Sequence, residues 1–263
     1  MQRAWVITRK EWAEIFKNRF VFFTVAFLPL ILTAIPLGTL YATGSTGDLG
    51  GLSSEDMPIS FRENCDGMEG DDCTRYFLVS QFLLLFMLMP LAIPVTIASY
   101  SIIGEKTRRT LEPILATPLT TVELLAGKAL AAVIPAVIAT WTAFGIFILG
   151  SSLLAVGPAV MARLTDPLWL MAVLIVGPQL AVAAVCVAVM VSSRANDPRV
   201  AEQLSMLVIL PLLALFFGQI AGLVLVNQRL ILWIAIALVF IDTGLLAFAV
   251  QLFQRETILT RWK

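Results

Sequence analysis

Six apolar runs, each long enough to cross a lipid bilayer, alternate along the chain with shorter stretches that carry most of its charges. A membrane-spanning helix needs about 20 apolar residues, and a run such as LVSQFLLLFMLMPLAIPV lacks the strict alternation typical of a membrane β-strand. The pattern therefore predicts an all-α polytopic membrane protein with six transmembrane helices. The predicted spans are residues 20–43, 77–103, 129–155, 168–192, 204–226 and 230–253.

Composition agrees with this class, because 59% of the 263 residues are hydrophobic and only 14% are charged. We interpret residues 1–263 as a single transmembrane domain. The chain contains no histidine, which excludes Ser-His hydrolysis, HExxH zinc chemistry and His-ligated haem. The stretch GEKT at 104–107 does not satisfy the phosphate-loop motif. We therefore expect no catalytic, cofactor or metal site on this chain, and no nucleic-acid partner.

The distribution of Lys and Arg predicts the orientation in the membrane. With the N-terminus inside, the inner segments hold 14 basic residues and the outer segments hold four. This bias predicts a multi-pass protein with both termini in the cytoplasm and the segment between the second and third spans on the same side.

Residues 1–19 predict an amphipathic helix that lies on the inner membrane surface. At 100° per residue, the large apolar side chains share one narrow face, and Arg9 lies at its edge, where it can snorkel. The apolar set is Trp5, Trp12, Phe16 and Phe20, and the polar set on the opposite face is Arg3, Lys10, Glu11, Glu14, Lys17 and Asn18.

Residues 44–76 predict an acidic outer loop, with eight acidic residues against two basic ones and no sign of a folded domain. Cys65 and Cys73 fall on the oxidising side of the membrane, so we expect them to form a disulfide.

The segment between the second and third spans, residues 104–122, predicts a cytoplasmic knob rather than a simple reversal. Thr110 can cap a short helix with Pro113 in its first turn, and Leu111, Ile114 and Leu115 recur at helical spacing. Thr120 and Glu123 then form the capping box that begins the third span.

This segment, EKTRRTLEPILATPLTTVELLAGK, resembles the signature of type-2 ABC transporter permeases. The resemblance covers Glu105, Lys106, Arg108, Thr110, Leu111, Glu112, Leu115, Ala116, Thr117, Pro118, Gly127 and Lys128. Thr107 and Arg109 depart from it, since Glu and Gly are common there. The run TRKEWAEIFKNRF at 8–20 is similar to the membrane-surface connecting helix of the same family.

The resemblance implies a permease subunit of an ATP-driven exporter in a bacterial or archaeal plasma membrane. The knob is then a coupling helix that docks on a separate cytoplasmic ATPase, which binds ATP and Mg. Two ATPase copies and a second permease chain, identical or related, complete the exporter. The residues expected to couple to the ATPase are Glu105, Lys106, Arg108, Thr110, Leu111, Glu112, Ile114, Leu115, Thr117 and Pro118.

Asp242 is an ionisable residue near the middle of the sixth predicted span, so a structural role and a transport role both stay open. Its hydrogen-bond partner cannot be chosen from the sequence among Gln81, Gln179 and Gln219. Two other functions also stay open: a secondary transporter that uses Asp242 as a proton or cation site, and a membrane scaffold or sensor that does not transport.

Overall fold

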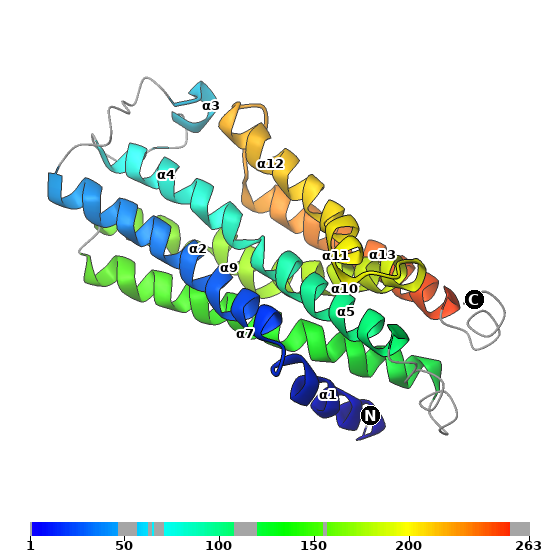
Figure 1. The fold of residues 1–263 in the computed structure, drawn as a ribbon. Coiled ribbons are helices and arrows are strands. Elements are labelled where there is room, and N and C mark those ends of the chain that lie inside the picture. Colours follow the sequence, from blue (N-terminus) through cyan, green and yellow to red (C-terminus); the bar gives the residue numbers. More distant parts are fainter. Residues whose placement is uncertain are drawn as a thin grey trace.

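The computed structural model describes residues 2–46, 57–62, 65, 71–107, 120–154 and 157–252. Within these residues the chain is mainly helical and contains no strand, which confirms the predicted all-α class. Six helical stretches are long and apolar enough to cross a membrane, and they form one elongated bundle (Figure 1). The stretches are Val21–Thr43, Asp72–Glu105, Val122–Leu153, Pro158–Arg194, Pro198–Ile220 and Gln228–Leu252.

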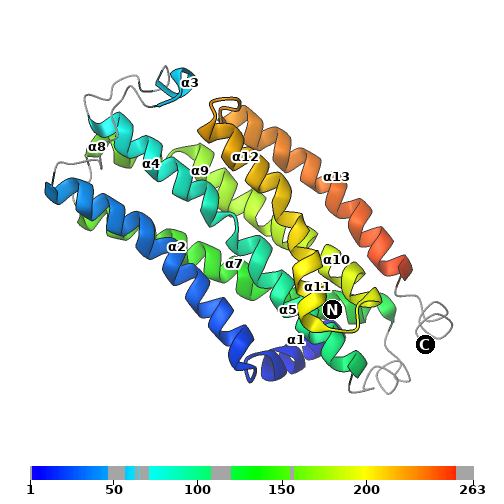
Figure 2. The ribbon, with the colours of Figure 1, turned by 45° about the horizontal axis from the view of Figure 1, so that its top comes forward.

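Several spans are assembled from shorter helices joined end to end. The start of α1 and the end of α13 lie at one end of the bundle, and α3 lies at the other (Figure 2). The helices are α1 (Gln2–Ile15), α2 (Arg19–Thr46), α3 (Ile59–Arg62), α4 (Asp71–Phe86), α5 (Met89–Thr107), α7 (Thr121–Leu153), α8 (Pro158–Leu164), α9 (Pro167–Met171), α10 (Gly177–Arg194), α11 (Pro198–Ser205), α12 (Leu210–Ile220) and α13 (Gln228–Leu252).

The joints inside the spans have identifiable causes in the sequence. The second span breaks between α4 and α5, and Pro90 follows in the first turn of α5, where its missing N–H is harmless. In the fourth span a π-helical segment, Ala172–Val176, separates α9 from α10. The Trp141 indole of α7 donates a 3.1 Å hydrogen bond to the Val173 carbonyl of this segment. A neighbouring helix thereby supplies a hydrogen-bond donor to an interior carbonyl of this span.

The second span lies at the centre of the bundle and the fifth lies at its edge. In the most apolar stretch of each, 78% of the second span is buried against 11% of the fifth. Helices in lipid associate through close packing rather than hydrophobic burial. Small side chains accordingly line the contacts of α7 and α10. Ala132, Ala136, Ala184 and Ala188 are all fully buried.

The fifth span begins six residues earlier than predicted, at residue 198 instead of 204. The Asp197 carboxylate caps α11, accepting from the backbone N–H of Arg199 at 2.7 Å, and Pro198 occupies the first helical position. After α12 the chain turns at Gly222, whose φ of 71° favours glycine. Hydropathy alone therefore misplaced both ends of the fifth span, because it does not take account of the helix cap at Asp197 or the turn at Gly222.

The predicted outer loop, 44–76, is shorter in the structure, because α2 continues to Thr46 and α4 begins at Asp71. Its described part also packs against the start of α4. Met57 and Phe61 are buried together with Cys73. Cys65 and Cys73 form a disulfide, with their Cα atoms 5.7 Å apart. The loop is thereby tied to the start of α4.

Candidate functional site

The N-terminal helix α1 docks against the first turns of α7. A Cβ atom added at Gly127 would stand 2.7 Å from Cβ of Ile7, so only glycine permits this approach. The Thr8 hydroxyl donates to the Gly127 carbonyl at 3.0 Å, and the Trp12 indole donates to the Ala131 carbonyl at 3.0 Å. Glycine and two polar side chains thus fix α1 along α7.

A buried charge cluster lies where α1, α5 and α7 meet. Nζ of Lys128 on α7 lies 2.8 Å from Oε1 of Glu11 on α1 and 2.7 Å from Oε2 of Glu105 on α5. The ammonium group also donates to the Ser101 hydroxyl at 2.9 Å, and that hydroxyl donates to Oε2 of Glu11 at 2.6 Å. The three charged side chains are at most 6% exposed. We call Glu11, Ser101, Glu105 and Lys128 the stem cluster.

Lys10 extends the stem cluster toward the surface. Its ammonium group donates to Oε1 of Glu105 at 2.8 Å and lies 3.5 Å from Glu14 one turn along α1. The Lys10 side chain is 42% exposed, so solvent screens this pair more than the Lys128 pairs. Glu105 therefore lies between two lysines, one buried and one half-exposed.

The electrostatics of the cluster shift two pKa values. Burial alone would raise the pKa of Glu11, but attraction to Lys128 and hydrogen bonds from Lys128 and Ser101 lower it below 4.5. Burial would likewise lower the pKa of Lys10, but its hydrogen bond and attraction to Glu105 raise it above 10.5. Both groups are therefore charged at neutral pH.

The energetic consequence is asymmetric. Taking charges out of water costs several kcal/mol per ion, so a satisfied buried pair gains about as much as it loses. Removing one partner leaves the other charge buried and uncompensated, at a cost of about 3 to 5 kcal/mol. The stem cluster thus favours one arrangement of α1, α5 and α7. If one of these helices shifts, the charges on the other two stay buried without their partner.

The predicted coupling residues fall partly outside the described structure. Glu105 belongs to the stem cluster, and Lys106 lies in the last turn of α5. The other predicted coupling residues lie outside the described residues, namely Arg108, Thr110, Leu111, Glu112, Ile114, Leu115, Thr117 and Pro118. The predicted capping box is confirmed, since Thr120 and Glu123 exchange both bonds at the start of α7.

The prediction for the polar face of α1 is wrong for Glu11, which was placed with exposed residues and is 2% exposed. The buried face of α1 is a separate stripe at helical spacing, comprising Ala4, Ile7, Thr8, Glu11 and Ile15. This 4-7-8-11-15 spacing is present in the sequence, beside the stripe of larger apolar residues on which the prediction was based. Trp5 and Phe16 stay exposed, at 46% and 41%.

Asp242 lies on α13 and is 9% exposed. Its Oδ1 atom is buried without a hydrogen-bond partner among the described residues. Gln219, one of the partners considered from the sequence, instead donates to the Ser80 hydroxyl at 3.3 Å. The structure therefore leaves both roles of Asp242 open.

Glu202 is an acidic residue of the fifth span that was not predicted from the sequence. Its Oε1 accepts a 2.6 Å hydrogen bond from the hydroxyl of Thr96, a fully buried residue in the middle of α5. The error follows from the late predicted start of the fifth span, which left Glu202 in a cytoplasmic loop. The signal that could have found it is the Asp197-Pro198 helix start.

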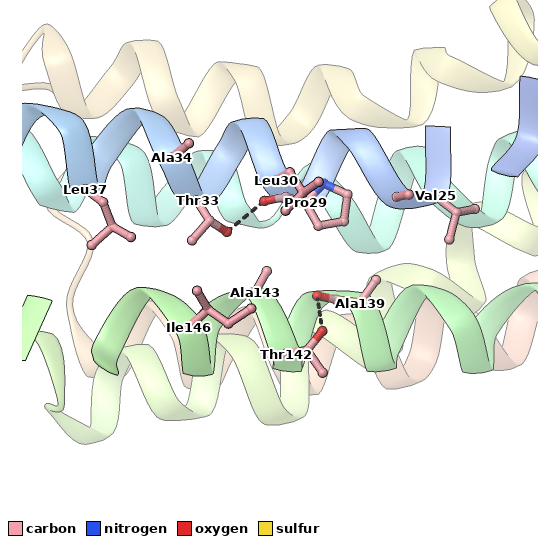
Figure 3. A pocket seen from close by; sticks show the side chains of 11 residues that line it. Val25, Pro29, Leu30, Thr33, Ala34, Leu37, Ala139, Thr142, Ala143 and Ile146 are labelled. Carbon is pink, nitrogen blue, oxygen red and sulfur yellow. Dashed lines mark hydrogen bonds between the residues drawn. The ribbon is translucent and has the colours of Figure 1, made fainter. Parts of the chain in front are cut away.

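An apolar groove of about 450 Å³ lies between α2 and α7 at mid-span (Figure 3). Pro29, Leu30 and Ile146 are among its lining residues. The hydroxyls of Thr33 and Thr142 bond to carbonyls of their own helices. The lining therefore suits an acyl chain or another apolar group better than a charged one.

These features define a polytopic helical membrane protein whose N-terminal helix is locked to the stem of one connecting segment. Residues 5–232 match the family described as ABC-2 family transporter protein. The chain belongs to this family and is a transport permease. Membership implies association with an ABC ATPase and with the membrane. A comparison with the curated proteins finds no match.

Proposed function

We propose that this chain is the membrane-spanning subunit of an ATP-driven exporter and couples to a separate cytoplasmic ATPase through residues 104–122. The stem cluster is the observation that carries the proposal. Glu105 lies two residues before the end of α5, and Lys128 lies in the second turn of α7. The cluster therefore ties together both ends of the connecting segment, and it ties them to α1.

This arrangement suits the transmission of force. A push on the segment reaches α5 and α7 together, because Lys128 holds Glu105 within 2.7 Å. α1 follows, because Glu11 shares the same ammonium group. α5 belongs to the most buried span, so displacement of its end is carried to the centre of the bundle.

In the proposed mechanism, two ATPase copies bind ATP and Mg and close on each other. Their closure moves the segments of two permease chains and switches access to a path between them. The single domain over residues 1–263 forms the path, and both termini lie on the cytoplasmic side of the membrane. The membrane is a bacterial or archaeal plasma membrane.

The test is to purify the chain alone, and together with an ATPase whose gene lies beside its own or that is co-expressed with it. The chain alone should hydrolyse no ATP, and the complex should hydrolyse ATP with stimulation by a transported compound. Export direction is read in inside-out vesicles, which should accumulate that compound when ATP is added outside. A chain that never co-purifies with an ATPase would overturn the proposal.

A secondary transporter is the second candidate, and it is favoured by the Oδ1 atom of Asp242, which has no hydrogen-bond partner in the described part of the chain. Such a protein would move substrate in vesicles under an imposed proton or cation gradient without ATP. Gradient-driven uptake that Asp242→Asn abolishes would favour this candidate over the exporter.

A further inference from the structure

Helix α1 presents an exposed face that neither α7 nor the stem cluster uses. This face carries Trp5, Val6 and Arg9, of which Val6 is 67% exposed, and Phe16 continues it directly after the end of α1. Arg9 lies one turn after Trp5 and two turns before Phe16, so the guanidinium group emerges between exposed aromatic side chains. An exposed cation among aromatic residues is the pattern of a helix seated at the headgroup level of a bilayer.

The position of α1 in the chain also places it at the headgroup level of the bilayer. Only residues 16–18 separate α1 from α2, and the membrane-spanning stretch of α2 begins at Val21. The two helices lie at an angle to each other, with α1 next to the N-terminal end of α2 (Figure 2). The exposed face of α1 is therefore held near the plane where the first span enters the bilayer.

The basic side chains where α1 meets α2 differ in whether they have an ion-pair partner. Lys10 is engaged with Glu105 and Glu14. Arg9, Lys17 and Arg19 are exposed, and their side chains form no ion pair or hydrogen bond with the described residues. We call these three residues the cationic edge. No acidic side chain among the described residues forms an ion pair with any of these three positive charges.

We propose that the cationic edge binds the phosphate groups of anionic phospholipids, with Trp5, Val6 and Phe16 inserted among the upper acyl chains. Lys and Arg donate charge-assisted hydrogen bonds to phosphate. A basic side chain beside an anionic leaflet adds an attraction that corresponds to about a fivefold preference per residue. Phosphatidylglycerol and similar lipids would therefore concentrate beside α1 relative to zwitterionic lipids.

This binding would bear on the stem cluster, because the same helix presents Glu11 to Lys128 on its opposite face. Anionic lipid would hold α1 in the position that satisfies the buried charges. The inference goes beyond the proposed transport function and does not depend on an ATPase.

The experiment places a photoreactive benzophenone amino acid at Val6 and reconstitutes the full chain in nanodiscs with equal amounts of phosphatidylglycerol and phosphatidylcholine. After illumination, mass spectrometry counts the two lipids crosslinked to α1. We expect crosslinked phosphatidylglycerol to outnumber crosslinked phosphatidylcholine by at least about fivefold, against a bulk ratio of one to one. The enrichment should shrink in 1 M salt, where the screening length falls to about 3 Å.

Two variants complete the test. Combined substitution of the cationic edge, Arg9→Gln with Lys17→Gln and Arg19→Gln, should return the crosslinked lipids to the bulk ratio. Arg229→Gln, which removes an exposed cation in the first turn of α13, is the matched control and should keep the enrichment. A bulk ratio in the parent protein, or unchanged enrichment in the triple variant, would overturn the proposal.

Discussion

Substitution of Lys128 tests how far the stem cluster holds α1 in place. Lys128→Met keeps an unbranched side chain of similar length but removes the ammonium group that Glu11 and Glu105 share. Both carboxylates then stay buried without their main cation. Truncating one side of a buried charge pair costs about 3 to 5 kcal/mol. The equilibrium between docked and detached α1 should therefore shift by a factor of about 10² to 10⁴.

The assay is amide hydrogen exchange of the α1 peptide, followed by mass spectrometry in detergent or nanodiscs. Exchange of α1 in Lys128→Met should be faster than in the parent, while the peptides of α10 keep their protection. Lys10→Met is the matched control, because its side chain is 42% exposed and its pair with Glu105 is worth about 0 to 1 kcal/mol.

A compensated variant separates charge from shape. Lys128→Met combined with Glu11→Gln and Glu105→Gln leaves no buried charge, so it should regain most of the α1 protection. Equal protection of α1 in the parent and in Lys128→Met would refute the reasoning, because the buried pairs would then contribute nothing to docking.

Three further predictions concern pH, the disulfide and the acid of the sixth span. The folded-state pKa of Glu11 lies below 4.5, so its contribution to α1 docking is complete above pH 4.5 and is lost as pH falls through the folded value. The pKa of Lys10 lies above 10.5, so its contribution is complete below pH 10.5 and is lost as pH rises through the folded value; hydrogen exchange across this range checks both signs. Non-reducing peptide mapping should recover Cys65 and Cys73 joined, and two free thiols in fresh protein would contradict the pairing. Asp242→Asn should assemble normally but transport more slowly if the carboxylate serves transport, whereas unchanged transport assigns it a structural role.

The number and type of the spans could be predicted from the sequence, because runs of about 20 apolar residues have few alternatives to a membrane helix. Helix boundaries were less predictable where hydropathy and local signals disagree. The fifth span starts at the Asp197-Pro198 pair rather than at its first long apolar run, and this shift hid Glu202. The capping box of Thr120 and Glu123 could be predicted, because its two residues lie within one helical turn of each other.

The stem cluster could be predicted only in part. Glu105 and Lys128 were selected through the family resemblance, but Glu11 was assigned to an exposed face. Its ion pair joins residues 117 positions apart, and no local pattern reports a contact of that range. A charged residue within an apolar stripe, as Glu11 is beside Ile7 and Ile15, was the available signal. It becomes meaningful only once a partner such as Lys128 is placed beside it.

The proposed coupling to an ATPase runs through the segment between α5 and α7. Glu112→Lys and Leu115→Asp reverse a charge and remove an apolar anchor in that segment, and truncation of an interface anchor costs more than about 1 kcal/mol. Asp56→Asn in the outer loop is the control. Both variants should insert and pair normally, since neither lies within a membrane span.

The most direct measurement is ATP-driven transport, with ATPase turnover recorded in the same proteoliposomes, for the parent complex, the two segment variants and the control. The account predicts that Glu112→Lys and Leu115→Asp lose ATPase subunits or hydrolyse ATP without transport, whereas Asp56→Asn behaves like the parent. Full ATPase occupancy and parental transport in both segment variants would show that residues 104–122 only connect two spans, and would contradict the account.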